Sequence, residues 1–96
     1  MIAQEWFNKG DEDLQSADIL LYDDGPIGVV CFHAQQAVEK YLKGFLQYHL
    51  VPPRKIHNLE ELIKDCQQYD KDILQYIDDA LLLTRYYLET RYPLPI

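Results

Sequence analysis

Polar and basic side chains recur every three or four residues between residues 33 and 47, which makes this run the richest in potential chemistry. At that spacing the side chains of a helix share one face. This polar ridge consists of His33, Gln36, Lys40, Lys43 and Gln47, and we expect it on the outer side of the helix, opposite the apolar stripe. Its cations and hydrogen-bond donors could hold a phosphate group. The competing interpretation is an ordinary solvated helix face.

Asp13 is a second candidate, because helical spacing places it within an apolar stripe beside Trp6 and Ala17. A carboxylate removed from water needs a partner. We expect Lys40, Arg91 or a tyrosine hydroxyl to supply one, in a contact that fixes helix packing. The functional alternative is that Asp13 orients an arginine or histidine at a site.

Other chemistry is sparse in the sequence. The histidines form no HExxH motif and no cluster with cysteine, so we predict no metal site and no cofactor. Ser16 has no histidine at helical spacing, which argues against a catalytic triad. Glycine-rich phosphate loops are missing from the sequence. Cys31 and Cys66 lie in apolar helical patterns, and we expect both to be buried thiols.

Charge is distributed unevenly along this chain of net charge −7. Residues 1–24 carry seven acids against one lysine, and residues 58–84 carry seven acids against two lysines. The segment between them is basic, so a polyanion could approach only one side. No signal peptide precedes the polar N-terminal segment, and no apolar run is long enough to span a membrane. We therefore expect a cytoplasmic protein.

Four helices must position these residues. Apolar periodicity predicts helices over residues 2–22, 26–50, 59–68 and 71–89. Asn58 and Glu61 have the spacing of a capping box, and Asp70 is placed to cap the last helix. No segment alternates with the period of a strand. The fold class we predict is all-α, an antiparallel up-and-down bundle of four main helices in one domain over residues 1–96.

The last predicted helix has two apolar faces. Its inner face is expected to contain Ile73, Ile77, Ala80, Leu81, Thr84 and Leu88. Leu82 and Tyr86 lie four residues apart on the outward face, beside acids and an amide. An outward apolar pair of this kind is a candidate interface anchor. We therefore expect a homodimer.

One further pattern covers nearly the whole chain. Residues 32–46 read FHAQQAVEKYLKGFL, followed by Pro-Pro-Arg at 52–54, His-Asn-Leu at 57–59, Tyr87, and Arg-Tyr-Pro at 91–93. Together with Asp13-Leu14 and Ala17, this pattern resembles the HEPN domain. The resemblance implies a helical bundle that commonly dimerises, occurs beside minimal nucleotidyltransferases in toxin–antitoxin pairs, and has nucleotide or RNA as its ligand.

Two departures from the family pattern bear on function. HEPN ribonucleases carry an arginine followed by four to six residues and a histidine, whereas only two residues separate Arg54 from His57. The family's usual final helix is also missing after Arg-Tyr-Pro. Three hypotheses remain: a nucleotide- or RNA-binding module, a metal-independent ribonuclease that uses His33 or His57, or a purely structural dimerisation domain. For the first, the ligand-binding candidates are His33, Gln36, Lys40, Lys43, His57 and Arg91.

Overall fold

A computed structural model of the chain describes residues 1–91, and all regular structure in that part is helical. The elements are α1 (Ala3–Tyr22), α2 (Ile27–Tyr48), α3 (Leu59–Cys66), the 3₁₀-helix η1 (Lys71–Tyr76) and α4 (Ile77–Arg91). The predicted all-α bundle is therefore confirmed. None of the helices in residues 1–91 is long and apolar enough to cross a membrane.

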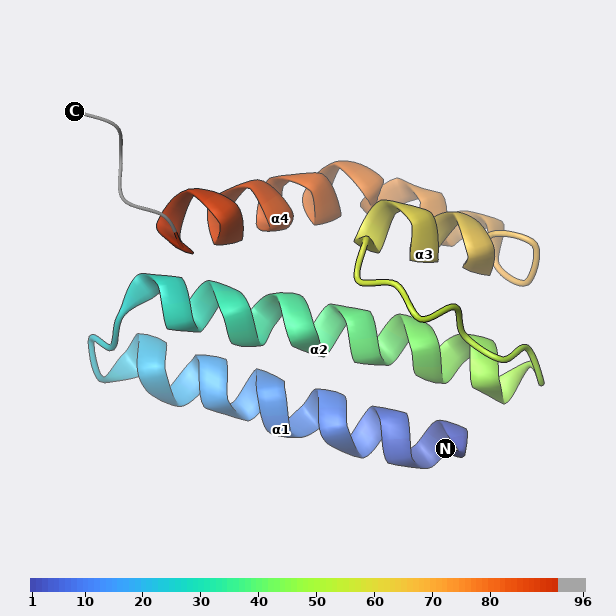
Figure 1. The fold of residues 1–96 in the computed structure, drawn as a ribbon, viewed down its shortest axis with the longest axis horizontal. Coiled ribbons are helices and arrows are strands. Elements are labelled where there is room, and N and C mark those ends of the chain that lie inside the picture. Colours follow the sequence, from blue (N-terminus) through green and yellow to red (C-terminus); the bar gives the residue numbers. More distant parts are fainter. Residues whose placement is uncertain (92–96) are drawn as a thin grey trace.

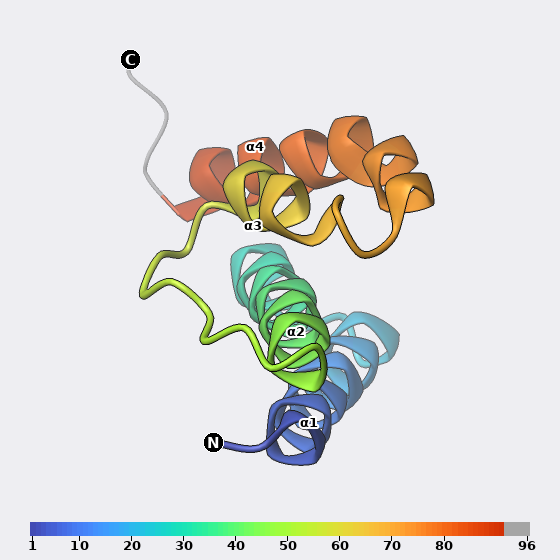
Figure 2. The same ribbon diagram turned by 90° about the vertical axis from the view of Figure 1, so that its right-hand side faces the viewer.

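Helix α2 is the centre of the fold. Figure 1 shows α1 running antiparallel to α2, with α3 and α4 on the other side of α2. The view along the bundle gives the same order, with α1 and the pair α3 and α4 separated by α2 (Figure 2). The segment 49–58 returns along α2 before α3 begins (Figure 1). Side chains on several faces of α2 are therefore enclosed by neighbouring helices.

The hydrophobic core joins α2 to the C-terminal helices. Leu59, Leu62, Ile63 and Cys66 fall at i, i+3, i+4 and i+7 in α3, so this short helix presents one apolar face. They pack with Leu42 and Leu46 of α2 and with Ala80 of α4. Burial raises the pKa of the Cys66 thiol to about 12, with a smaller contribution from the negative charge of Asp65. Cys31 is only partly buried, contrary to the expectation of two buried thiols.

Helices α1 and α2 approach closely through small residues. A Cβ atom added to Gly44 would lie 2.6 Å from the ring of Phe7, and one added to Gly10 would lie 2.7 Å from the ring of Tyr41. Both distances are shorter than carbon atoms tolerate. The two glycines therefore set how near α1 can come to α2.

The predicted last helix begins differently from expectation. Asp70 accepts a hydrogen bond from the backbone N–H of Asp72, as predicted for a cap, but residues Lys71–Tyr76 form a 3₁₀-helix. Tight turns of this kind are common where an α-helix starts. The buried side of α4 is also rotated, since Leu81 and Leu88 are about half exposed while Leu83 and Tyr87 are half-buried.

Candidate functional site

Asp13 binds two members of the polar ridge. Its carboxylate accepts a hydrogen bond from Lys40 Nζ through Oδ2, and His33 Nδ1 lies 2.9 Å from Oδ1. Asp13 is buried, whereas His33 and Lys40 each retain about a quarter of their side-chain exposure. Lys40, one of the partners expected for this carboxylate, thus pairs with one oxygen, and His33 lies within hydrogen-bond distance of the other.

Two opposing effects act on the Asp13 carboxyl. Burial favours its neutral form, while the hydrogen bonds from Lys40 and His33 and the charge of Lys40 favour its ionised form. The interactions with Lys40 and His33 outweigh burial, and the pKa of Asp13 is lowered from its ordinary value. The carboxylate therefore ties α1 to α2 as an ion.

A second carboxylate of α2 holds the other cation of the ridge. Glu39 is 5% exposed, and its Oε2 accepts a hydrogen bond of 3.2 Å from Lys43 Nζ. His57 Nδ1, from the segment before α3, lies 3.0 Å from Glu39 Oε1. Lys43 is itself buried, with Nζ 5.7 Å from the centre of the Trp6 ring. Each carboxylate thus holds one histidine and one lysine.

These contacts change the interpretation of the ridge. The pattern predicts Lys40 and Lys43 on the outer side of the helix, opposite its core. Lys43 is instead buried, and both ammonium groups are already paired with carboxylates. The ridge lies along the junctions of α2 with its neighbours, because α2 is covered on more than one side (Figure 2).

Gln36, His57 and Arg91 line a common groove between α2 and α4. Its volume is about 410 Å³, and Glu39, Asn58 and Tyr87 also border it. The Thr84 hydroxyl of α4 donates a 3.0 Å hydrogen bond to the Gln35 amide oxygen of α2, which joins the two walls. Three of the six predicted ligand-binding residues therefore meet at one site.

Aromatic rings continue this groove toward the start of α2. Phe32 and Tyr87 lie 5.9 Å apart between ring centres and also line a neighbouring hollow of about 530 Å³ that includes Arg91. Arg91 Nη1 donates a 2.7 Å hydrogen bond to the Tyr87 hydroxyl. Phe32 is more than a third exposed. Aromatic faces next to arginine are suited to stacking a planar base near a phosphate.

The sequence of the chain matches the model of a known domain family. The model of the HEPN domain matches residues 3–95, nearly the whole chain. The chain belongs to the HEPN domain family. No curated protein and no solved structure matches it. Membership supports a nucleotide- or RNA-related module in general terms.

Arg54, the arginine nearest to His57 in the sequence of this chain, pairs with two acids of α3. Arg54 donates hydrogen bonds to Asp65 at 2.8 and 3.0 Å and to Glu61 at 3.2 Å. These two acids of α3 raise the pKa of Arg54, with the Asp65 hydrogen bond contributing most. His57 instead contacts Glu39 of α2. Arg54 and His57 therefore have separate acidic partners.

Sequence reasoning missed Glu39, Phe32 and Tyr87 as site residues. A signal for Glu39 was present, because it lies on the same helical face as Leu42 and Leu46, at spacings of three and seven residues. Phe32 and Tyr87 belong to the HEPN-like pattern, but that pattern does not show that their rings meet, since the meeting depends on how α4 packs on α2. Among residues 1–91, no three His, Cys, Asp or Glu side chains are grouped to hold a metal ion.

The interface candidates lie where the pattern predicts. Leu82 is 45% exposed and Tyr86 is 51% exposed on α4. Leu81 and Leu88 are exposed to a similar extent. The helix therefore presents a larger apolar surface to solvent than its predicted pair alone.

Proposed function

We propose that this HEPN domain is a nucleotide- or RNA-binding module that holds its ligand in the groove between α2 and α4. It acts as a homodimer and as the partner of a minimal nucleotidyltransferase of the toxin–antitoxin type. The observation that carries the proposal is the convergence of Gln36, His57 and Arg91 beside the rings of Phe32 and Tyr87.

The groove offers two kinds of contact to such a ligand. Phe32 and Tyr87 present aromatic faces on which a base can stack. Arg91 supplies a fixed positive charge, and Gln36 and His57 supply hydrogen-bonding groups. Because the whole chain carries a net charge of −7, binding rests on this local set of contacts.

Lys40 and Lys43 take a different role in this proposal from the one their spacing predicts. Each is paired with a buried carboxylate, and removal of either lysine would leave that carboxylate without its cation. Substitution of these lysines would therefore lower stability together with binding. They position α1 and the Glu39 side of the groove, while Arg91 contacts phosphate.

The test compares two arginines of the same helix. Arg91→Gln is expected to weaken binding of AMP or of a short single-stranded RNA about tenfold, the usual effect of losing one charge-assisted hydrogen bond. Arg85→Gln is the matched control, because Arg85 is exposed, lies on α4 and pairs with Glu89 of the same helix at 2.9 Å. Isothermal titration at two salt concentrations measures both variants.

Three outcomes would argue against the proposal. Equal affinity of Arg91→Gln and Arg85→Gln would remove the groove as the site. No binding of any nucleotide at millimolar concentration would favour the purely structural dimerisation domain. If no nucleotidyltransferase is encoded beside the gene for this chain, the proposed partner would be excluded.

A further inference from the structure

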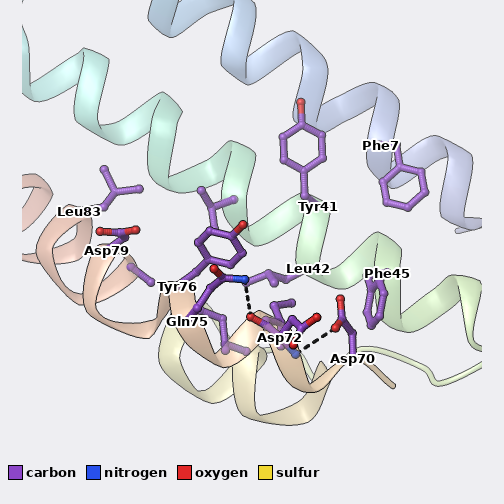
Figure 3. A pocket seen from close by; sticks show the side chains of 14 residues that line it. Phe7, Tyr41, Leu42, Phe45, Asp70, Asp72, Gln75, Tyr76, Asp79 and Leu83 are labelled. Atoms are coloured by element: carbon purple, nitrogen blue, oxygen red, sulfur yellow. Dashed lines mark hydrogen bonds between the residues drawn. The ribbon is translucent and has the colours of Figure 1, made fainter. Parts of the chain in front are cut away.

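A second groove lies on another face of α2 and is apolar. Its volume is about 640 Å³, and fourteen residues line it. Apolar side chains of α2 form one wall, and η1 and α4 form the other (Figure 3). Tyr76, from the end of η1, is 53% exposed within it. The groove is thus open to solvent and large enough for several side chains of a ligand.

Acids border this apolar surface at both ends. Asp79 lies at one end, Asp70 and Asp72 lie toward the other, and Tyr76 stands between them (Figure 3). No lysine or arginine is among the fourteen lining residues, and Lys71 is exposed beside them. Asp70 caps η1, whereas Asp79 is exposed on α4. The border is therefore negative around an apolar floor.

The Tyr41 hydroxyl adds no free donor to the groove. It donates a 2.6 Å hydrogen bond to Asp11 of α1, and this bond, with burial, raises the pKa of Tyr41 to about 12. Tyr41 therefore contributes its ring to the wall. The other polar groups of the lining are the border acids, the Gln75 amide, whose Nε2 donates a hydrogen bond to the Asp72 carbonyl, and the exposed Tyr76 side chain.

We propose that this groove binds a basic amphipathic helix of another protein. The α2 residues that line it extend from Val38 to Phe45, about 10 Å along the axis. Two turns of a partner helix, with apolar side chains at i, i+3 or i+4, and i+7, match that length. Lysine or arginine side chains flanking the apolar stripe would meet Asp70, Asp72 and Asp79.

Charge selects this occupant over two others. A second copy would bring a chain of net charge −7 against a groove bordered by three acids, so like charges would meet at this face. RNA would be repelled by the same carboxylates. The proposal uses a different face from the groove lined by Arg91, and it stands whether or not that groove binds nucleotide.

The probe is a helical peptide of about 18 leucines and lysines, with leucine at the positions that form one stripe. A second peptide of the same composition with scattered leucines keeps the charge and removes the stripe. Fluorescence anisotropy should detect binding of the first peptide and not of the second. Amide shifts in an NMR titration should cluster at Phe45, Ile73 and Tyr76, which line the groove.

Paired acid substitutions give the matched control. Asp72→Asn with Asp79→Asn should weaken peptide binding about fivefold, as expected from two partly exposed charge pairs. Glu5→Gln with Glu12→Gln removes the same charge from exposed sites of α1 outside the groove and should change affinity less than twofold. Equal loss in both variants, binding of the scattered peptide, or shifts confined to α1 would overturn the proposal. Conversion of a dimer to a monomer by Tyr76→Ala would also overturn it, because a second copy would then fill the groove.

Discussion

Two carboxylates of this HEPN domain pair with the two lysines of the polar ridge, so the ridge is not a row of unpaired cations. Asp13 holds Lys40 and His33, and Glu39 holds Lys43 and His57. Charged groups leave water only when they are paired, so an acid at each junction fixes one lysine there. Each acid also contacts one histidine, since Asp13 meets His33 of α2 and Glu39 meets His57 of the segment before α3.

The Asp13 cluster makes stability depend on pH in one direction. Since the folded-state pKa of Asp13 is lowered from its ordinary value of 3.8, the contribution of Asp13 to the free energy of unfolding is fully present above that value. It is lost as pH falls through the folded-state pKa. At pH 7, Asp13→Asn should lower the free energy of unfolding by about 2 kcal/mol, since hydrogen bonds to a charged group are removed.

Urea unfolding at pH 7 and at pH 3 measures this effect. The stability difference between wild type and Asp13→Asn should shrink at pH 3, because Asp13 of the unfolded chain takes up a proton below its ordinary pKa of 3.8 while the folded state still holds the carboxylate ionised. Glu12→Gln is the control, because Glu12 is the exposed neighbour of Asp13 on α1. A difference between wild type and Asp13→Asn that is the same at both pH values would show that the ionised carboxylate is not what stabilises the junction.

Absence of ribonuclease activity is a second prediction at this scale. Proton transfer by a positioned histidine is worth about 10²- to 10⁴-fold, and the family's arginine–histidine spacing is missing here. Arg54 binds the acids of α3, while His57 binds Glu39. Purified protein in EDTA should therefore leave structured and unstructured RNA intact.

Histidine variants decide between this prediction and the enzymatic alternative. RNA cleavage by the wild type that is lost in His57→Ala or in His33→Ala would make the chain a metal-independent ribonuclease. Cleavage that persists in both variants would point to a contaminating nuclease. His49→Ala serves as a third variant, because His49 stacks on Tyr69 at 4.5 Å at the far end of α2.

Among the elements, the end of α2 carries an unusual cap. Leu50 has φ of 62°, and the N–H groups of Leu50 and Val51 bond to the carbonyls of Gln47 and Leu46 at 2.9 Å each. This is the pattern in which glycine normally takes the left-handed position. Leu50 is 86% exposed, so its side chain gains little from packing.

Leu50→Gly should therefore stabilise the domain by about 0.5–1 kcal/mol, through relief of the left-handed backbone. Thermal unfolding by circular dichroism measures the change. Leu50→Ala is the matched control, since it shortens the side chain and retains the backbone cost. Equal stability of the two variants would mean that the left-handed conformation costs nothing at this position.

The cap also shows where prediction from sequence stops. Asn58 was predicted to begin α3, and its side chain accepts the bond from Glu61 N–H at 3.0 Å, because asparagine there is a local signal. Leucine at position 50 carries no such signal. The all-α class and helix positions followed from local periodicity, whereas the 3₁₀ start of the last helix and the rotation of α4 depend on tertiary packing. The groove at Arg91 depends on that same packing.

At the scale of the whole molecule, α4 exposes several large apolar side chains, as α1 also does. Leu81, Leu82, Tyr86 and Leu88 are each 45–51% exposed, on a helix with one fully buried side chain, Ala80. At about 100° per residue, Leu82 and Tyr86 form one exposed apolar strip and Leu81 and Leu88 form another, and an exposed apolar strip of this kind is a candidate interaction site. Helix α4 also forms one wall of each groove. A dimer through the outer face of α4 would therefore place the two grooves beside the interface and leave them open.

The chain is therefore expected to be a homodimer through the outer face of α4, with twice the mass of one 11.4 kDa chain in light scattering. Leu82→Asp with Tyr86→Asp should raise the dissociation constant by at least about 30-fold, because loss of even one buried apolar anchor costs about 2 kcal/mol or more. Leu21→Asp with Tyr22→Asp makes the same chemical change at exposed positions of α1 and should leave the dimer intact. A single-chain mass for the wild type at tens of micromolar, with helicity unchanged, would remove the dimer. Dissociation by the α1 pair alone would move the interface to α1, where Leu14 and Ile19 are also about half exposed.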